Sequence, residues 1–295
     1  MSAAKHYTQL VNMPQMALTG LSESWLFKEI GDCHWHMLCE NLGLKSNEIF
    51  DEFENRLYAT FIRIRFESRN CLKDFRENDA LDIEGNIQRL GNSLYYGQVD
   101  VTSSEKSIRC YLATTFSTRE STSCNRKLTK GVPSGSEANA ITKMSDIPTH
   151  VLEYTKLKKG SIQKVVVGNH SFALTDEVIF KTLYKINPYT DINGVGLLYF
   201  AAYPLINDFC ELEYFNDKHI SGEHWALNSA TMMRDVFYFG NCNIDDVISY
   251  RLHSSEIISD NQIALYSSLW RENDSTVIAR IFTIKQFETI EANTI

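Results

Sequence analysis

The sequence predicts an α+β fold made of two copies of one unit, in which a long helix is followed by antiparallel strands. Three observations lead to this prediction. A polar segment divides the 295 residues almost in half, each half contains one long apolar helical pattern, and strand-like patterns follow each helix in the same order. The length allows one large domain or two of ordinary size.

The polar segment covers residues 124–148 and is rich in Lys, Ser, Gly and Asn, with weak periodicity. Such a composition is typical of a linker or a long surface loop. We therefore expect a first repeat at residues 1–123, a linker at residues 124–148 and a second repeat at residues 149–295.

The first helix is predicted at residues 22–42. Four apolar residues spaced i, i+4, i+7 and i+11 define one helical face: Leu26, Ile30, Cys33 and Met37. Ser22 is a suitable N-cap, and Gly43 stands where a helix-ending glycine is expected.

The second helix is predicted at residues 196–212, where the sequence is apolar nearly all round. That pattern indicates deep burial. Pro204 lies inside this range, so we expect it to kink or break the helix.

Segments with a strand pattern follow each helix, and one more, at residues 178–186, precedes the second. In the first half they are residues 58–66, 80–90, 94–101 and 108–116, and in the second half residues 232–239, 247–252, 263–270 and 276–284. A long helix wrapped by a curved antiparallel sheet is the hot-dog arrangement. Two in one chain predict a double hot-dog, a pseudo-dimer within one polypeptide.

Composition and charge exclude several classes of protein. A formal charge of -8 argues against a nucleic-acid binder or an anionic-membrane binder, since both need a basic surface. No apolar run approaches the roughly 18 residues of a membrane span, and the N-terminus is a poor signal peptide. Seven cysteines without a C-x-x-C pair indicate reduced thiols in a cytoplasmic protein.

A glycine-containing turn precedes the second helix. Asp191 or Asn193 can cap that helix, while Gly194 and Gly196 let backbone N–H groups approach a ligand. A helix N-terminus aimed at a thioester carbonyl would stabilise an oxyanion, so Asn193, Gly194, Val195 and Gly196 are candidate substrate contacts. From spacing alone, a capped turn that packs tightly is the better interpretation.

Neither a metal nor a nucleotide cofactor is predicted. Cys33, His34, His36 and Cys39 could in principle hold zinc, but there is no second ligand cluster, and core packing explains them better. The sequence has no Walker loop and no dinucleotide fingerprint after a strand.

Two sets of residues resemble known families. Asp191, Asn193 and Gly194, followed by an apolar helix, look like the aspartate-x-asparagine-glycine turn of hot-dog thioesterases, except that Val195 replaces the usual histidine. Residues 21–35 (LSESWLFKEIGDCHW) and 56–61 (RLYATF) resemble the leinamycin-pathway bifunctional acyltransferase/decarboxylase family, over nearly the full chain.

That second resemblance implies a double hot-dog protein of polyketide biosynthesis without a cofactor. Such a protein takes a (methyl)malonyl group from its coenzyme A thioester onto a tyrosine, decarboxylates it and passes propionyl or acetyl to an acyl carrier protein. Tyr58 matches the catalytic tyrosine. Ser22 and His34 lie in the matching segment and are candidate substrate contacts.

A free phenol has a pKa near 10, so a nucleophilic tyrosine needs a nearby donor, cation or base. His34, Arg56 and Arg63 are candidates by their proximity in the sequence to Tyr58. Two alternatives stay open: a thioesterase or dehydratase acting on acyl-coenzyme A or acyl carrier protein, and a non-catalytic module that binds acyl carrier protein. The sequence also leaves open a homodimer.

Overall fold

The computed structural model describes residues 4–121, 124–134 and 141–288, and most of its strands form one antiparallel sheet of eleven. The strand order is β1-β5-β6-β7-β4-β12-β15-β14-β13-β11, with β8 pairing with β7. The first half supplies β1 (Lys5–Leu10), β4 (Tyr58–Ser68), β5 (Ala80–Leu90), β6 (Leu94–Ser103), β7 (Lys106–Ser121) and β8 (Cys124–Gly131). The second half supplies β11 (Phe180–Lys185), β12 (Ser229–Tyr238), β13 (Val247–Ser259), β14 (Gln262–Arg271) and β15 (Thr276–Phe287).

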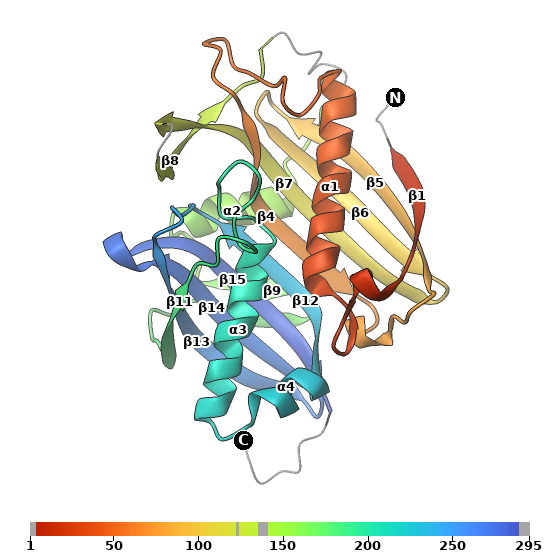
Figure 1. The fold of residues 1–295 in the computed structure, drawn as a ribbon, viewed down its shortest axis with the longest axis vertical. Helices are drawn as coiled ribbons and strands as arrows, with labels where there is room; N and C mark the ends of the chain where they lie inside the picture. Colours follow the sequence, from red (N-terminus) through yellow and green to blue (C-terminus); the bar gives the residue numbers. More distant parts are fainter. Residues whose placement is uncertain (1–3, 122–123, 135–140, 289–295) are drawn as a thin grey trace.

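The two halves have the same topology. In each, the strand before the long helix lies at the outer edge, and the strand after the helix lies at the centre of the sheet. The central strands β4 and β12 pair antiparallel and join the halves. Helices α1 (Glu23–Leu42) and α3 (Ala202–Asp217) both lie across one face of the sheet (Figure 1). The predicted double hot-dog fold is therefore confirmed.

Helix α1 begins and ends where its sequence predicts. The Ser22 hydroxyl accepts a hydrogen bond from the Trp25 amide at 3.2 Å, and Gly43 ends the helix with a φ of 64°, a conformation that glycine adopts without steric cost. The predicted apolar face is buried against the sheet: Leu26, Ile30, Cys33 and Met37.

Helix α3 differs from its prediction. It begins at Ala202 rather than at residue 196, because the amides of Leu197 and Leu198 donate to the Asn193 and Asn241 side chains instead of entering a helix. Pro204 therefore falls in the first helical turn. Its missing N–H is not needed there, so Pro204 neither kinks nor breaks the helix.

The predicted linker is also wrong in its first part. Residues 124–131 form strand β8, which pairs with β7 from Phe116↔Gly131 to Ser121↔Cys124. Lysines and other polar residues on this strand concealed the pairing from a periodicity test. Residues 135–140 of the predicted linker lie outside the described residues.

Several smaller elements were not predicted from the sequence. Helix α2 (Thr149–Lys158) lies on the sheet face opposite α1 and α3 (Figure 1). The others are the paired strands β2 (Met16–Ala17) and β3 (Gly20–Leu21), the paired strands β9 (Lys164–Val167) and β10 (His170–Ala173), helix α4 (Gly222–Asn228) and strand β1. Within the described ranges, no helix is long and apolar enough to cross a membrane.

Candidate functional site

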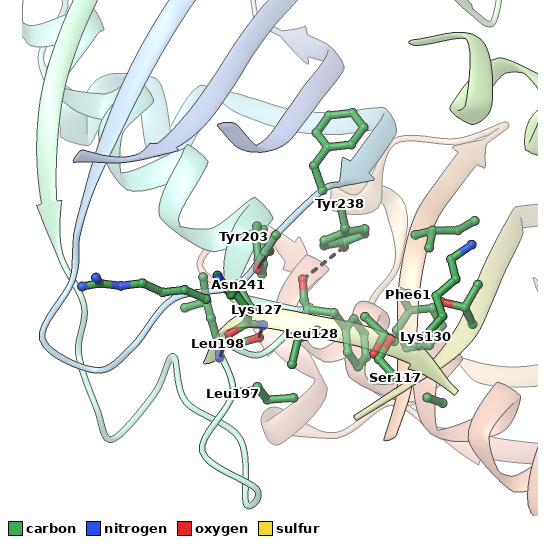
Figure 2. Close-up of a pocket in the computed structure, with 18 of the residues that line it drawn as sticks. Phe61, Ser117, Lys127, Leu128, Lys130, Leu197, Leu198, Tyr203, Tyr238 and Asn241 are labelled. Atoms are coloured by element: carbon green, nitrogen blue, oxygen red, sulfur yellow. Dashed lines mark hydrogen bonds between the residues drawn. The ribbon is translucent and has the colours of Figure 1, made fainter. Parts of the chain in front are cut away.

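A cavity of about 350 Å³ lies where the two repeats meet. Strands β4, β7 and β8 of the first half form one side, and the turn before α3 and the end of β12 form the other, with α2 contributing Tyr154 and Lys158. Phe61, Ser117 and Lys130 lie together on one side, and Leu198, Tyr203 and Asn241 lie on the other (Figure 2).

Tyr58 does not itself line this cavity, but it immediately precedes Ala59, which does. It pairs with Ser117 across β4 and β7, and Ser117 pairs with Lys130 across β7 and β8. Directly paired residues in a sheet point to the same face with Cβ atoms about 4.5–5.5 Å apart. Ser117 and Lys130 line the cavity, so Tyr58 shares a sheet face with two lining residues.

Two arginines surround the Tyr58 side chain. The Arg119 Nη1 lies 3.5 Å from the Tyr58 hydroxyl, and the guanidinium groups of Arg56 and Arg119 each lie 5.3 Å from the ring centroid. A cation at the phenol oxygen stabilises negative charge there. Sequence reasoning missed Arg119, because it lies 61 residues from Tyr58 and is brought near only by the β4–β7 pairing.

Arg119 also connects Tyr58 to the turn before α3. Its Nη2 donates to the Val195 carbonyl, and its Nε donates to the Asn125 side chain at 2.8 Å. The Asn125 amide group donates in turn to the Gly196 carbonyl at 2.6 Å. The structure thus brings Tyr58, from the first repeat, together with Val195 and Gly196, from the second.

The amides of that turn are mostly used within it. The Asn193 side chain accepts from the amides of Val195 at 3.1 Å and Leu197 at 3.0 Å, and the Gly196 amide donates to the Asn193 carbonyl at 2.8 Å. These bonds are those of a capped turn. Among described residues 193–198, only the exposed Gly194 amide has no internal acceptor, so it remains free to face a ligand.

Asp191 holds the turn from inside the protein. It is fully buried and accepts hydrogen bonds from the Tyr184 hydroxyl at 2.9 Å, the Asn187 amide at 2.7 Å and the Thr190 hydroxyl at 2.9 Å. Asn193 lines the cavity, whereas Asp191 does not. The carboxylate therefore orders the turn and does not face the cavity.

His34 lies behind the cavity wall. Its Nε2 is 2.9 Å from the Thr114 hydroxyl, and its ring packs against Phe61, which lines the cavity, at 5.6 Å between centroids. Burial lowers the pKa of His34 to about 3, so its ring is neutral near pH 7. His34 therefore lies behind Phe61 and does not itself line the cavity.

Ser22 lies elsewhere, at the start of α1. Its neighbours Leu21 and Glu23 line a second cavity of about 190 Å³. The structure does not bring Ser22 to the cavity beside Tyr58.

Arg63, a candidate activator by sequence proximity, has another role. It is fully buried and donates to Asp235 of the second repeat through Nε at 2.9 Å and Nη2 at 2.6 Å. Burial raises the pKa of Asp235, but attraction to Arg63 and Arg65 outweighs it and holds that pKa well below its usual range. Arg63 therefore ties the repeats together and is not free to assist Tyr58.

Exposed lysines surround the opening of the cavity. We call Lys127, Lys130 and Lys158 the cationic mouth. Lys127 lies 3.9 Å from Glu120, whereas Lys130 and Lys158 form no ion pair within the described part of the chain. The nearby Arg126 is already paired with Asp246. A chain with a net charge of -8 thus has free positive charge at this cavity.

The cysteines and histidines of α1 do not gather into a site. No group of three or more His, Cys, Asp or Glu suited to a metal ion occurs in the residues that the structure describes. Cys33 is in the core, and His36 is 2.9 Å from Glu40 on the helix surface.

Comparison with solved structures finds full-length similarity to thioesterases. A 12:0-ACP thioesterase from Umbellularia californica (ACP, acyl carrier protein) aligns with a TM-score of 0.65 and 12% identity, over 97% of this chain and 94% of that one. A protein described as an oleoyl thioesterase from Lactobacillus plantarum gives 0.65 and 10%, over 98% of both chains. An acyl-ACP thioesterase from Bacteroides thetaiotaomicron gives 0.59 and 11%, over 96% and 98%.

Comparison by sequence finds no match. No family model matches the chain, and no curated protein does. At identities of 10–12%, the structural similarity establishes the double hot-dog fold.

Proposed function

We propose that this protein is an enzyme acting on acyl thioesters, and specifically an acyltransferase/decarboxylase. It takes a malonyl-type group from coenzyme A onto Tyr58, decarboxylates it and passes the shortened acyl group to an acyl carrier protein. The observation that carries the proposal is the position of the Tyr58 hydroxyl, 3.5 Å from Arg119, a residue that also binds the turn of the other repeat.

The first step is acyl transfer to Tyr58. The phenol oxygen attacks the thioester carbonyl, the carbon–sulfur bond breaks, and the coenzyme A thiolate takes the proton that the phenol loses. Arg119 stabilises the negative charge on the phenol oxygen during attack. The free Gly194 amide is a suitable donor to the thioester oxygen, as sequence analysis anticipates for this turn.

The second step is loss of carbon dioxide from the acyl group. The bond to the carboxylate breaks, its electron pair forms an enolate, and the enolate carbon takes a proton. This step is favoured where the carboxylate is poorly solvated and a donor holds the carbonyl oxygen. Buried aromatic side chains at the bottom of the cavity provide such a surface, and they include Phe61, Tyr203 and Tyr238.

The cationic mouth suits the carriers of the acyl group. Coenzyme A and the phosphopantetheine arm of a carrier protein both carry phosphate, which lysines bind as point charges. Lys130 and Lys158 are free for that role. The fold shared with proteins described as acyl-ACP thioesterases supports the same class of substrate.

Intact-protein mass spectrometry tests the proposal. After incubation with malonyl-coenzyme A or methylmalonyl-coenzyme A, the wild-type protein should gain the mass of an acyl group, and Tyr58→Phe should gain none. Tyr189→Phe is the matched control, since Tyr189 is 94% exposed. An adduct that persists in Tyr58→Phe contradicts the assignment of the nucleophile.

Hydrolysis of an acyl thioester is the second candidate, because Asn193 of the aspartate-x-asparagine-glycine turn lines the cavity. Release of free acid without an acyl-enzyme would establish it. Two features count against it: the Asp191 carboxylate is buried in the turn, and Val195 replaces the histidine. Binding of acyl carrier protein with no turnover would instead indicate a non-catalytic module.

A further inference from the structure

Two phenylalanines, one from each repeat, meet at the bottom of the cavity. The rings of Phe61, on β4, and Phe200, before α3, lie 4.5 Å apart between centroids. We propose that this pair determines which acyl groups enter, by limiting them to short chains of a few carbons. The inference rests on the proposed action on acyl thioesters and names the part of the site that selects the acyl group.

Within the described residues, helix α1 and the side chain of His34 pack directly behind the pair. A Cβ added to Gly31 of α1 would lie 2.2 Å from the Cζ of Phe200, so the Phe200 ring rests directly on the helix backbone. The His34 ring lies against the other side of Phe61, with 5.6 Å between ring centroids. An acyl chain that reaches Phe61 and Phe200 therefore meets filled core and cannot continue along α1.

Hydrogen bonds and an edge-to-face ring contact hold the pair in position. The Tyr238 hydroxyl donates to the Phe200 carbonyl at 3.1 Å, and the Tyr203 hydroxyl donates to the Gly240 carbonyl at 2.7 Å. The rings of Tyr203 and Tyr238 lie 5.0 Å apart. The hydrogen bond from Tyr238 fixes the backbone of Phe200, so this bond as well as side-chain packing positions the Phe200 ring.

The size of the cavity agrees with a short acyl group. Its volume of about 350 Å³ is near the lower limit of ligand pockets, which span about 300–1,000 Å³. The thiol end of a pantetheine arm must share that space with the acyl group. The structurally similar 12:0-ACP thioesterase is, by contrast, named for a twelve-carbon group.

Binding measurements with a series of acyl-coenzyme A thioesters test the inference. Calorimetry with the Tyr58→Phe protein and saturated acyl groups of two to twelve carbons gives affinity without acyl transfer. We expect affinity to fall at least tenfold between propionyl and dodecanoyl. In the Tyr58→Phe background, Phe61→Ala or Phe200→Ala should raise the affinity for decanoyl-coenzyme A about tenfold, since each opens space toward α1.

Controls separate selection from folding. Phe209→Ala removes a phenylalanine that is 50% exposed on α3, and it should leave the chain-length profile unchanged. Phe61→Leu and Phe200→Leu are smaller changes for use where an alanine variant does not fold, and they should shift the profile in the same direction. Equal affinity for propionyl and dodecanoyl, or an unchanged profile in the folded variants, overturns the inference.

The outcome is distinguishable from that of the proposed function. A preference for short chains without any acyl adduct would contradict the transferase proposal and support selection by Phe61 and Phe200. An adduct on Tyr58 with equal affinity for all chain lengths would support the transferase proposal and contradict that selection. Failure to bind any member of the series overturns both.

Discussion

The cavity beside Tyr58 has a counterpart at the equivalent position of the second repeat. The start of β4 lines the first cavity at residues 59–62, and the start of β12 lines the second at residues 229–231. Both strands have a register shift near the end of these residues, between Phe61 and Arg63 and between Thr231 and Met233. Each cavity also contacts the segment that precedes the long helix of the other repeat.

The chemistry of the two positions differs. Phe61 pairs with Thr114 in the first repeat, and at the same register Thr231 pairs with Lys285 in the second. Lys285 donates to Asp208 at 3.0 Å and to Glu211 at 2.5 Å. The first repeat thus has Phe61 beside the Thr114 hydroxyl, whereas the second repeat has the buried ion pairs of Lys285 at this position.

Arg234 extends this ionic cluster across the repeats. It donates to Glu23, at the start of α1, through Nε at 2.6 Å and to Asp208 of α3 at 2.8 Å. Burial raises the pKa of Asp208, but attraction to Arg234 and Lys285 outweighs it and lowers that pKa.

The comparison shows how one fold uses equivalent positions differently. Cations at the second cavity are bound to carboxylates of the protein: Lys285 binds Asp208 and Glu211 within its own repeat, and Arg234 binds Glu23 of the other repeat. At the first cavity Lys130 and Lys158 form no ion pair within the described residues, so they can bind an anionic ligand. We therefore expect one active position in each chain, beside Tyr58.

The largest expected effect concerns the second cavity. Arg234→Met should lower the free energy of unfolding by about 3–5 kcal/mol, because it leaves Glu23 without its buried cation and Asp208 with Lys285 alone. Urea unfolding measures the change. Arg109→Met removes a surface pair with Asp100 and should cost at most about 1 kcal/mol. Equal losses in the two variants would contradict a structural role for the second cavity.

The next effect concerns the first cavity. Arg119→Lys should slow acylation about 10- to 100-fold, or about 1.4–2.7 kcal/mol, because an ammonium group cannot reach Tyr58, Asn125 and Val195 together. The rate of adduct formation under saturating substrate measures it, with circular dichroism to confirm folding. Arg56→Lys is the control, since the Arg56 guanidinium lies over the Tyr58 ring and forms no ion pair within the described residues, and it should cost less than about fivefold. If Arg56→Lys lost more of the acylation rate than Arg119→Lys, Arg56 and not Arg119 would be the residue that assists Tyr58.

Periodicity identified the parts of the fold that depend on local sequence. The apolar spacing in α1 reflects which face is buried, and the predicted bounds of α1, β4 and β5 are close to the observed elements. The register shift between Phe61 and Arg63 breaks the alternation expected along β4. The start of α3 could not be found in this way. It depends on a hydrogen bond from the Leu198 amide to the side chain of Asn241, a residue 43 positions later in the sequence.

The candidate site also combines features that local sequence predicts with features that depend on distant residues. Tyr58 could be placed on a strand, but the family resemblance, not periodicity, selected it. Ser117 and Arg119 lay beyond the predicted end of the last strand of the first half, and Lys130 lay in the predicted linker. Strand pairing brings these residues together, and a single sequence does not reveal that pairing. The repeat boundaries, a homodimer and a cytoplasmic location stay predictions.

The smallest expected effect tests the free charge at the cationic mouth. Lys130→Met should weaken binding of coenzyme A about two- to fivefold at low salt, because one exposed ion pair contributes about 0.2–1 kcal/mol. The difference should shrink in about 0.5 M salt, where charges are screened within a few ångströms.

Lys45→Met is the matched control for that titration, since its side chain is 81% exposed and lies outside the cavity. Equal affinities of the Lys130 and Lys45 variants at low salt would mean that the mouth does not bind phosphate. A salt-dependent loss confined to Lys130→Met would support the contrast between the cavities. Lys130 is free to bind an anionic carrier, whereas Lys285, at the second cavity, is bound to Asp208 and Glu211.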